Sequence, residues 1–367
     1  MSIEALVELS RYYGANKDYV IAGGGNSSFK TADTLYVKGS GTALAEAVPE
    51  TFVKMDRGAL ARIWNKTYPA SSAEREKEVL ADLLAARKPG EEQKRPSVET
   101  MLHDLLPFKY VMHLHPALVN GLSCSRQGET AMKELFGNEA LWVPSTNPGY
   151  VLSLEVKIAL DKFTTKNNRP AAIIILQNHG VFVGAEDPDG INEIYRRIME
   201  SLEAKVKTSP DFSGKTTSVP SEYIRVLNEL NNAYINFINN KAISNHVKNL
   251  FSFYPVSSAF TPDHIIYSGS DPLFIEKISK EEVKAQWKKH IEKTGRLPKI
   301  MAVKELGVFG LGVTEKAAAL AVELFMDSVR IACYSESFGG PLFMDREKID
   351  FINNWEVEVF RTKVSTK

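Results

Sequence analysis

The residues best suited to chemistry lie in a short apolar run, residues 110–116, with the sequence YVMHLHP. Within it, His113 and His115 are separated by a single apolar residue. Side chains alternate between the two faces of a β-strand, so both imidazoles would point to the same side. They would lie about 6.6–6.8 Å apart along the strand, close enough to converge on one ion. Because neutral imidazole is the commonest metal ligand in proteins, this spacing predicts a pair of metal ligands.

A third histidine follows a second apolar run. His179 lies in the sequence Asn-His-Gly, directly after residues 171–177, which read AAIIILQ. Three protein ligands with one open coordination position are typical of a catalytic zinc site, whereas a structural zinc usually has four closed ligands. The sequence therefore predicts a metal site of the catalytic kind formed by His113, His115 and His179.

Other histidines leave alternatives open. A lone histidine is more often a core or surface residue than a ligand, and His103, on a predicted helix, competes for the third ligand position. The remaining ones, His246, His264 and His290, are expected to be solvated surface residues.

Glu99 is the candidate for proton transfer. It lies 14 residues before His113, at the start of a helix predicted from Pro96 to Leu106. If the chain between them folds back, the carboxylate can serve as a ligand, as a general base, or as both in turn. The alternative is that Glu99 only complements the partial positive charge at the helix N-terminus.

Two glycine-rich loops precede these residues. Residues 23–30 read GGGNSSFK and residues 38–42 read KGSGT. Glycine allows sharp turns and close approach of the backbone to a ligand, and the neighbouring hydroxyl, amide and ammonium groups can bind phosphate oxygens. Neither loop has the spacing of a Walker or dinucleotide-binding motif, and a loop of this kind taken alone is more often an ordinary turn.

The composition excludes several classes of protein. Among 367 residues, Lys+Arg and Asp+Glu both total 45, which argues against a general binder of nucleic acid or of a membrane surface. The two cysteines, Cys124 and Cys333, form no disulfide framework and lack metal-type spacing, so we expect a reducing compartment. The N-terminus resembles no signal peptide and no stretch suits a membrane span, so we expect a cytoplasmic protein.

The chain divides at a polar stretch rich in Ser, Thr, Pro and Gly, residues 208–221. We expect a metal-binding α/β domain over residues 1–210 and a smaller C-terminal α/β domain over residues 221–367. Within these domains, we expect residues 117–136 of the first to be helical and residues 260–275 of the second to be extended.

The second part echoes the first. Residues 178–182 (NHGVF) match residues 305–309 (ELGVF), and residues 33–40 match residues 263–270. In the first match, Leu306 stands where the first part has its turn histidine. One hypothesis is that the C-terminal domain is a shortened, metal-free relative of the first. The alternative is that any strand–turn–helix unit looks similar.

Taken together, the motifs resemble the class II aldolase/adducin family, closest to the aldolase part of bifunctional rhamnulose-1-phosphate aldolase/alcohol dehydrogenase proteins. We expect no dehydrogenase domain, because the chain ends at Lys367 without room for a nucleotide-binding domain. A nicotinamide oxidoreductase is not expected either, since residues 307–312 (GVFGLG) have the wrong glycine spacing for that cofactor. The motifs are GNSS (25–28), KGSGT (38–42), PSVE (96–99), HLH (113–115) and NHG (178–180), with SESFGG (335–340) and WEVE (355–358) typical of that subgroup.

The resemblance implies a role for each residue. A three-layer α/β/α sandwich with a mainly antiparallel central sheet would carry the site, and the chain would assemble as a homo-oligomer, commonly a tetramer. A divalent ion, usually zinc, would bind the three histidines, and Glu99 would be the acid/base. The phosphate pocket would comprise Asn26, Ser40, Gly41 and Ser97, with Ser27 and Lys38 nearby.

The resemblance also implies an activity, the retro-aldol cleavage of a ketose 1-phosphate such as rhamnulose 1-phosphate. Dihydroxyacetone phosphate and an aldehyde would be the products. Relatives often carry a tyrosine after the residue matching Pro144, to handle the aldehyde-side proton, but this chain has Ser145 there, and Tyr150 is the nearest substitute. Sugar-phosphate epimerisation or decarboxylation, and a non-catalytic adducin-like binding module, are the alternatives.

Overall fold

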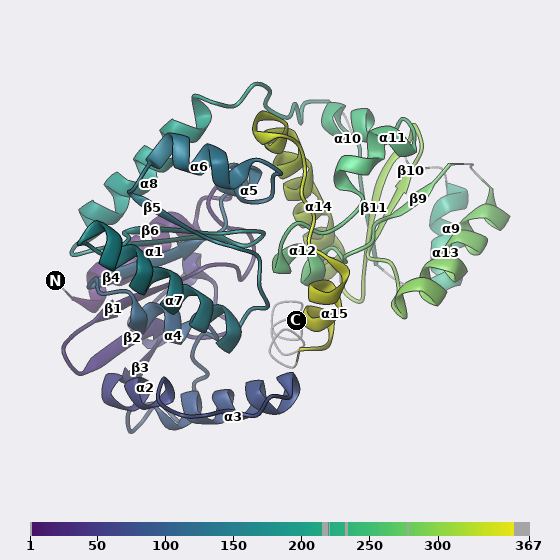
Figure 1. The fold of residues 1–367 in the computed structure, drawn as a ribbon. Coiled ribbons are helices and arrows are strands. Elements are labelled where there is room, and N and C mark those ends of the chain that lie inside the picture. Colours follow the sequence, from purple (N-terminus) through teal and green to yellow (C-terminus); the bar gives the residue numbers. More distant parts are fainter. Residues whose placement is uncertain (1, 215–218, 220, 232–233, 277–278, 356–367) are drawn as a thin grey trace. The chain divides into compact units, whose positions relative to one another are not determined.

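The structure is a computed structural model that describes residues 2–214, 219, 221–231, 234–276 and 279–355 (Figure 1). Contacts divide these residues into two compact units, each described here by itself. The first unit holds residues 2–123, 128–205 and 355, and the second holds residues 124–127 and 206–354. The division after residue 205 lies beside the polar stretch at 208–221. Two short segments are exceptions: residues 124–127 belong to the second unit, and Trp355 belongs to the first.

The first unit is built on a seven-stranded sheet in the order β3-β2-β1-β4-β7-β6-β5. Every neighbouring pair is antiparallel except β5 and β6, which are parallel. The strands are β1 (Asn26–Lys30), β2 (Thr34–Lys38), β3 (Phe52–Asp56), β4 (Tyr110–Leu114), β5 (Ala140–Val143), β6 (Ile173–Leu176) and β7 (Gly180–Ala185).

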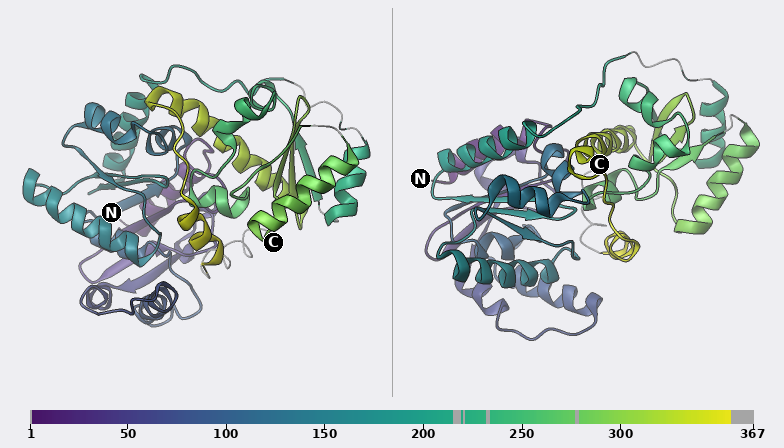
Figure 2. Two further views of the ribbon diagram at one scale, coloured as in Figure 1. Left: turned by 45° about the vertical axis from the view of Figure 1, so that its right-hand side comes forward. Right: turned by 45° about the horizontal axis from the view of Figure 1, so that its top comes forward.

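Helices cover both faces of this sheet, which makes the three-layer α/β/α sandwich that the resemblance implied (Figures 1 and 2). On β1, the Ser27 side chain meets α1 and the neighbouring Ser28 side chain meets α4, so these helices lie on opposite faces. The helices are α1 (Ile3–Gly14), α2 (Arg57–Ile63), α3 (Ser72–Ala85), α4 (Thr100–Leu105), α5 (Ala117–Ser123), α6 (Gly128–Phe136), α7 (Tyr150–Asn167) and α8 (Pro188–Glu203), with 3-10 helices η1 (Leu44–Glu46) and η2 (Pro49–Thr51).

The helical stretch predicted over residues 117–136 is interrupted. The region 117–136 forms two helices, α5 and α6, because residues 124–127 leave the helical path and pair with the second unit's own segment at residues 338–342. Among the described helices, none has the length and apolar content needed to span a bilayer.

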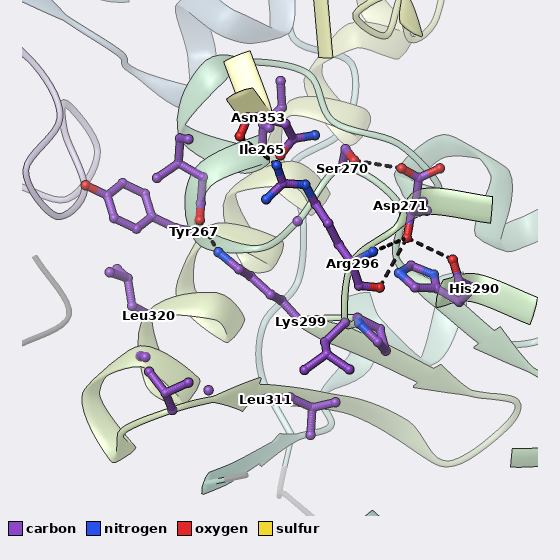
Figure 3. A pocket seen from close by; sticks show the side chains of 18 of the residues that line it. Ile265, Tyr267, Ser270, Asp271, His290, Arg296, Lys299, Leu311, Leu320 and Asn353 are labelled. Atoms are coloured by element: carbon purple, nitrogen blue, oxygen red, sulfur yellow. Dashed lines mark hydrogen bonds between the residues drawn. The ribbon is translucent and has the colours of Figure 1, made fainter. Parts of the chain in front are cut away.

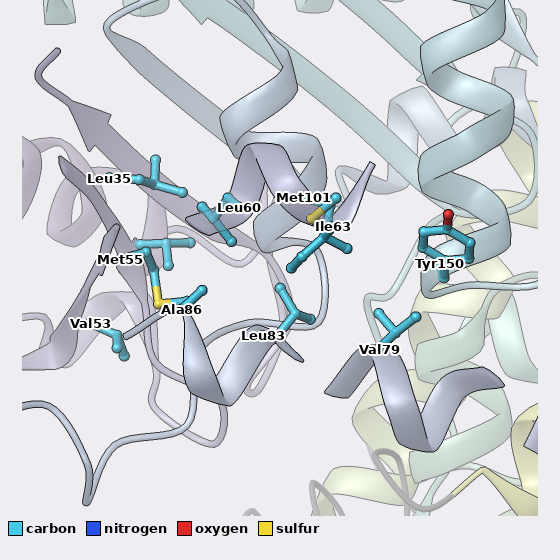
Figure 4. Close-up of a cluster of buried hydrophobic side chains, with 11 residues drawn as sticks. Leu35, Val53, Met55, Leu60, Ile63, Val79, Leu83, Ala86, Met101 and Tyr150 are labelled. Carbon is cyan, nitrogen blue, oxygen red and sulfur yellow. The ribbon is translucent and has the colours of Figure 1, made fainter. Parts of the chain in front are cut away.

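The buried core lies against both β2–β3 and the central strands. Figure 4 shows one cluster, in which side chains of β2 and β3 pack against those of α2 and α3. A second cluster joins α4 and α7 to β4, β6 and β7, through Leu102 and Val156 on the helices and Val111, Ile174 and Phe182 on the strands. This packing fixes the distance between α4 and the sheet.

Lys30 fixes α4 from the sheet side. Its buried ammonium group donates hydrogen bonds to the carbonyl oxygens of His103, at 2.6 Å, and of Leu106, at the C-terminal end of α4. Burial lowers the pKa of Lys30 from 10.5 to about 7. The helix that follows Glu99 is therefore tied to β1 by a cation that titrates near neutral pH.

This burial predicts a pH dependence of stability. Because the folded-state pKa of Lys30 lies below that of the unfolded chain, the unfolded state binds more protons between about pH 7 and 10. The free energy of unfolding should therefore rise with pH in that window, by at most about 1.4 kcal/mol per pH unit from this group. Denaturant titrations at several pH values should show a smaller rise in Lys30→Met than in the wild type. The control Lys54→Met, at an exposed position of β3, should keep the wild-type slope. Equal slopes in wild type and Lys30→Met would contradict this assignment.

The second unit contains a four-stranded sheet in the order β8-β11-β10-β9. Its strands are β8 (Tyr234–Ile238), β9 (Leu273–Ile275), β10 (Ile300–Val303) and β11 (Gly307–Gly312). Its helices are α9 (Ser221–Asn231), α10 (Lys241–His246), α11 (Leu250–Phe253), α12 (Pro262–Tyr267), α13 (Lys280–Thr294), α14 (Glu315–Ser335) and α15 (Arg346–Asn354), with 3-10 helices η3 (Tyr254–Val256) and η4 (Glu336–Phe338).

This smaller sheet repeats half of the larger one. The order and strand directions of β8-β11-β10-β9 match those of β4-β7-β6-β5, with one parallel pair at the same end. Ile300 opens β10 as Ile173 opens β6, and Gly307 opens β11 as Gly180 opens β7, each 127 positions later. The turn between these strands holds a non-glycine residue with positive φ in both units.

The register shows which residues replace the histidines. His113 pairs with Phe182 across β4 and β7, and Phe237 pairs with Phe309 across β8 and β11. Phe237 thus occupies the place of His113, and Leu306 the place of the turn histidine. This agreement supports the proposal that the second unit is a metal-free relative of the first, which differing strand orders would have excluded.

Three expectations for the second unit were wrong. The second sequence echo joins unlike structures, because residues 33–40 contain strand β2 whereas residues 263–270 contain most of helix α12. Helix α12 also interrupts the stretch 260–275, which was expected to be extended. Within α12, His264 is buried rather than solvated, with its ring nitrogens beside Thr261 Oγ1 at 2.8 Å and Asp327 Oδ2 at 3.2 Å.

Candidate metal centre

Three histidines meet at one end of β4 and β7. His113 lies on β4, His115 follows its last residue, and His179 lies in the turn between β6 and β7. Because Leu114 pairs with Val181, the end of β4 lies beside the start of β7. One ligand atom from each histidine can be chosen so that all three lie within 4.8 Å of one another. The predicted trio therefore forms a cluster able to hold a metal ion.

The Asn-His-Gly turn makes this approach possible. Asn178 has φ of 59°, the left-handed conformation that asparagine tolerates better than most residues. A Cβ atom on Gly180 would lie 2.6 Å from both His115 Cδ2 and the carbonyl oxygen of Leu114. Glycine is thus required at this position because any side chain would displace a candidate ligand.

The tautomer of His113 suits a metal ligand. Its Nδ1 lies 3.1 Å from the carbonyl oxygen of Val181, so the N–H is placed on Nδ1 and the lone pair on Nε2. That Nε2 atom lies 2.9 Å from Nε2 of His115. The ring of Phe182 stacks on His113, with centroids 4.0 Å apart. The coordinating nitrogen is thereby held in one orientation.

Glu99 completes the cluster from the end of the preceding loop. Its carboxylate is buried, with Oε1 at 3.4 Å from His113 Nε2 and 3.5 Å from His179 Nε2. Oε1 has no hydrogen-bond donor among the described residues. A buried carboxylate oxygen without a donor is costly unless a cation or an acidic proton approaches it. This oxygen, facing imidazole nitrogens, fits a site built for a divalent cation.

The other oxygen of Glu99 is held by an amide. Asn26 Nδ2 donates to Oε2 at 2.6 Å, and the backbone of Asn26 pairs with His113 in the β1–β4 register. Asn26 Oδ1 in turn meets Nε2 of His103, and His103 Nδ1 lies 2.7 Å from Ser28 Oγ. The hydrogen bond at each end fixes which way the amide of Asn26 points.

His103 therefore supports the site rather than ligating the ion. It is fully buried, and burial together with the nearby charges of His113, Lys30 and Lys38 holds its pKa well below its usual range. A neutral ring can donate from Nε2 to Asn26 and accept at Nδ1 from Ser28. Sequence reasoning missed this role, although His103 stands one helical turn after Glu99, the spacing that places two side chains on one face of a helix.

The candidate phosphate residues fall into two groups. The loop after β2 lies beside the segment before α4: the N–H of Ser40 donates to the carbonyl of Arg95 at 2.8 Å, and that of Ser97 donates to the carbonyl of Lys38 at 3.1 Å. The Ser97 hydroxyl also accepts from the backbone N–H of Glu99 at 3.2 Å. The structure thus brings Lys38, Ser40 and Ser97 to the segment that carries Glu99.

The other two candidates, Gly41 and Ser27, have different positions from this group. Gly41 has φ of 84° and lets the loop after β2 turn beside Ser40. Ser27 is fully buried, and its hydroxyl lies 2.7 Å from that of Ser10 on α1. Alternation along β1 places Ser27 on the face opposite Asn26, so the structure does not bring Ser27 to the histidines.

Neither candidate for the aldehyde side supplies a phenol at the cluster. Ser145 follows β5, where its backbone N–H donates to Gln177 Oε1 at 3.0 Å. The Tyr150 ring packs in the core cluster of Figure 4 against Tyr68, with centroids 4.9 Å apart, and burial raises its pKa. Tyr150 therefore does not take the place of the tyrosine of relatives.

The chain is similar to proteins of one family. The sequence model of the Class II Aldolase and Adducin N-terminal domain matches residues 4–204. A Bacillus subtilis protein named as an uncharacterized oxidoreductase, YuxG, is 28% identical over 193 residues, which cover 50% of this chain and 26% of that protein. The chain thus spans about a quarter of the length of this curated relative.

Solved structures of related proteins are also similar. The N-terminal class II aldolase domain of a conserved Thermoplasma acidophilum protein is 25% identical, with a TM-score of 0.47, and the match covers 56% of this chain and 94% of that one. YgbL from Escherichia coli, a putative aldolase/epimerase/decarboxylase, is 17% identical, with a TM-score of 0.39 and coverage of 55% and 86%. An L-fuculose 1-phosphate aldolase is 16% identical, with a TM-score of 0.39 and coverage of 62% and 94%.

The cluster predicts the effect of removing one ligand. His113→Ala should abolish stoichiometric zinc binding, because only two imidazoles would remain. Metal analysis after dialysis should find about one divalent ion per chain in the wild type. His290→Ala, a change on α13 of the second unit, should bind as the wild type does. Retention of stoichiometric zinc by His113→Ala would refute the ligand assignment.

The hydrogen bonds of His103 predict that the protein loses stability when this side chain is replaced. His103→Leu leaves Asn26 Oδ1 and Ser28 Oγ buried without their partner, so the free energy of unfolding should fall by about 1–3 kcal/mol. Ser28→Ala in the His103→Leu background should cost less than Ser28→Ala alone, because the two residues interact. A double-mutant cycle by denaturant unfolding measures both quantities, and additive losses would contradict the coupling.

Proposed function

The chain belongs to the class II aldolase and adducin family, and on that premise we propose that it is a zinc-dependent aldolase. Its substrate is a ketose 1-phosphate such as rhamnulose 1-phosphate, and its products are dihydroxyacetone phosphate and an aldehyde. The observation that supports this best is the buried Oε1 of Glu99, which lacks a hydrogen-bond donor among the described residues and faces two imidazole nitrogens.

The proposed metal ligands are His113, His115 and His179. These residues would hold a divalent ion, whose Lewis acidity toward substrate oxygens would stabilise negative charge next to the bond that breaks. The protein's contribution is to hold the rings in place: the carbonyl of Val181 fixes the tautomer of His113, and Gly180 leaves room for His115.

Glu99 is the proposed acid/base residue. When the carbon–carbon bond breaks, the hydroxyl on the carbon that becomes the aldehyde loses its proton to Glu99, and the electron pair of the broken bond stays with the three-carbon phosphate fragment. Protonated Glu99 then supplies that proton to the carbon of the fragment. In the reverse direction the carboxylate removes the same proton. Asn26, held by His103, donates to Oε2 and leaves Oε1 to carry the proton on the side of the histidines.

The phosphate group has a proposed cradle in the loop after β2. This loop, which contains Ser40 and Gly41, is hydrogen-bonded to the segment before α4 that contains Ser97, and Lys38 supplies a positive charge. Backbone N–H groups and hydroxyls of such turns bind anions. Asn26 belongs to the same proposed pocket through its position at the start of β1.

The position of Ser145 supports a second candidate function. An aliphatic hydroxyl is a far weaker acid than a phenol, so it does not replace the tyrosine on the aldehyde side. Epimerisation or decarboxylation of a sugar phosphate at the same ion is therefore the alternative reaction. A purely binding, adducin-like module is less well supported, since a scaffold has no need of an open metal site beside a buried carboxylate.

The assembly and location complete the proposal. We infer a cytoplasmic homo-oligomer, a tetramer, as the resemblance to the family implied. Both cysteines, Cys124 and Cys333, carry free thiols, which supports a reducing compartment. Sedimentation velocity should find a single species about four times the mass of the chain, and a monomer would contradict this part.

Glu99→Gln tests the catalytic role. The neutral amide keeps the shape of the side chain but cannot transfer the proton, so turnover should fall by about 10²–10⁴-fold or more while zinc content and far-ultraviolet circular dichroism stay unchanged. Glu91→Gln, a change at another buried acid, should leave turnover unchanged. Wild-type-like activity of Glu99→Gln would remove Glu99 from the mechanism.

A substrate screen tests the proposed reaction itself. Purified protein is incubated with a panel of ketose 1-phosphates, and released dihydroxyacetone phosphate is measured with and without a chelator. Release that the chelator stops and zinc restores supports the aldolase. An isomeric sugar phosphate or carbon dioxide as the product would instead support the alternative reaction, and absence of both turnover and metal binding would support the binding module.

A further inference from the structure

The second unit contains a cavity of about 480 Å³, within the size range of small-molecule sites (Figure 3). It lies among α12, α13, α14 and α15, beside Lys299, which precedes β10, and Leu311, near the end of β11. Leu306, which replaces the turn histidine, lies at the other end of the β10–β11 hairpin. The cavity is therefore not the counterpart of the metal centre in the first unit.

One part of the lining is apolar. Ile265, Leu311 and Leu320 are buried side chains that line the cavity. Two further lining residues are exposed: Leu297 to 50% and Val313 to 84%. Single exposed apolar residues are common on protein surfaces, but two that line one cavity offer a contact for the apolar body of a ligand.

Cationic side chains line the same cavity. The Lys299 ammonium donates to the carbonyl oxygen of Ile266, and Arg296 Nη2 donates to the carbonyl oxygen of Asn353 at 2.7 Å and to Asn354 Oδ1 at 3.3 Å. In Figure 3 the two cationic side chains extend toward the same side of the cavity. Within the described ranges, neither of them forms an ion pair with a carboxylate.

The acid that lines the cavity in the described part of the chain does not neutralise these groups. Asp271 accepts from Arg346 Nη1 and from Lys293 Nζ, each at 2.9 Å, and from Ser270 Oγ at 2.6 Å. Its charge is thus matched by other cations. His290, another titratable residue of the lining, has its pKa lowered by burial.

The positive charge of Lys299 lies in a partly desolvated environment. Burial, together with the charge of Arg296, lowers the pKa of Lys299 from 10.5 to about 8. An anion that binds between two neighbouring cations stabilises the charged form of both. A guanidinium group also presents a planar pair of donors that matches the oxygens of a carboxylate or a phosphate.

We propose that this cavity is a binding site for a small amphipathic anion, whose oxyanion group lies against Arg296 and Lys299 and whose apolar body lies against Leu311 and Leu320. Carboxylates and phosphates share the chemistry that these residues recognise. The inference concerns the second unit alone and does not rest on the reaction proposed for the metal centre.

Fluorescence titration of the full-length protein with 8-anilinonaphthalene-1-sulfonate, an aromatic anion, tests the site. The dye should bind saturably, with one site per chain whose signal hexanoate or hexyl phosphate displaces. The stronger of these two competitors identifies the preferred headgroup. Hexylamine, with the same apolar chain and the opposite charge, should not compete. Absence of saturable binding, or equal displacement by hexylamine, would overturn the proposal.

Variants place the dye in this cavity. Arg296→Met and Lys299→Met should each weaken binding about tenfold or more, which corresponds to at least about 1.4 kcal/mol. Ala317→Phe fills the cavity from α14 without removing a charge and should weaken binding as well. The control Lys284→Met, at a lysine on α13 outside the lining, should bind as the wild type does.

Folding is checked by circular dichroism for every variant. If Lys299→Met does not fold, Arg296→Met and Ala317→Phe decide the question, because Arg296 is exposed and Ala317 can be enlarged toward the cavity. Unchanged dye affinity in both of these variants would overturn the assignment. Aldol cleavage is measured in parallel, so a failure of the proposed reaction is distinguished from a failure of this site.

Discussion

The site depends on the buried carboxylate of Glu99, whose two oxygen atoms lie in different environments. Oε2 of Glu99 is held by the amide of Asn26, whereas Oε1 faces the imidazoles of His113 and His179 with no hydrogen-bond donor among the described residues. A buried carboxylate oxygen without a hydrogen-bond donor is costly unless a cation or a proton approaches it. The same geometry therefore favours a metal ion beside Glu99 and keeps one oxygen available for proton transfer.

The sheet register creates this geometry. Asn26 pairs with His113 across β1 and β4, and His113 pairs with Phe182 across β4 and β7, so three neighbouring strands bring the amide, the ligand and its stacking partner together. The second unit repeats the β4–β7 arrangement with Phe237 in the place of His113. The half-sheet thus forms with or without metal ligands, and the chemistry depends on a few side chains at one end of its strands.

Much of this arrangement was predictable from local patterns. Spacing along one strand identified His113 and His115, and the motif order implied the sandwich. The support by His103 was not predictable, because it depends on which helix covers each face of β1. Ser27 points away from the histidines because residues 26–30 form a strand rather than the loop that was expected. The burial of Tyr150 likewise depends on how α3 and α7 pack together. Such packing between distant segments leaves no periodic signal in the sequence.

Anomalous scattering from zinc-loaded crystals, measured on both sides of the zinc absorption edge, tests the central claim most directly. We expect one zinc peak per chain, about 2.0–2.1 Å from a ring nitrogen of each of His113, His115 and His179, with a carboxylate oxygen of Glu99 facing the ion's open side. A zinc peak bound by other residues, or no peak at the three histidines in zinc-soaked crystals, would contradict the account.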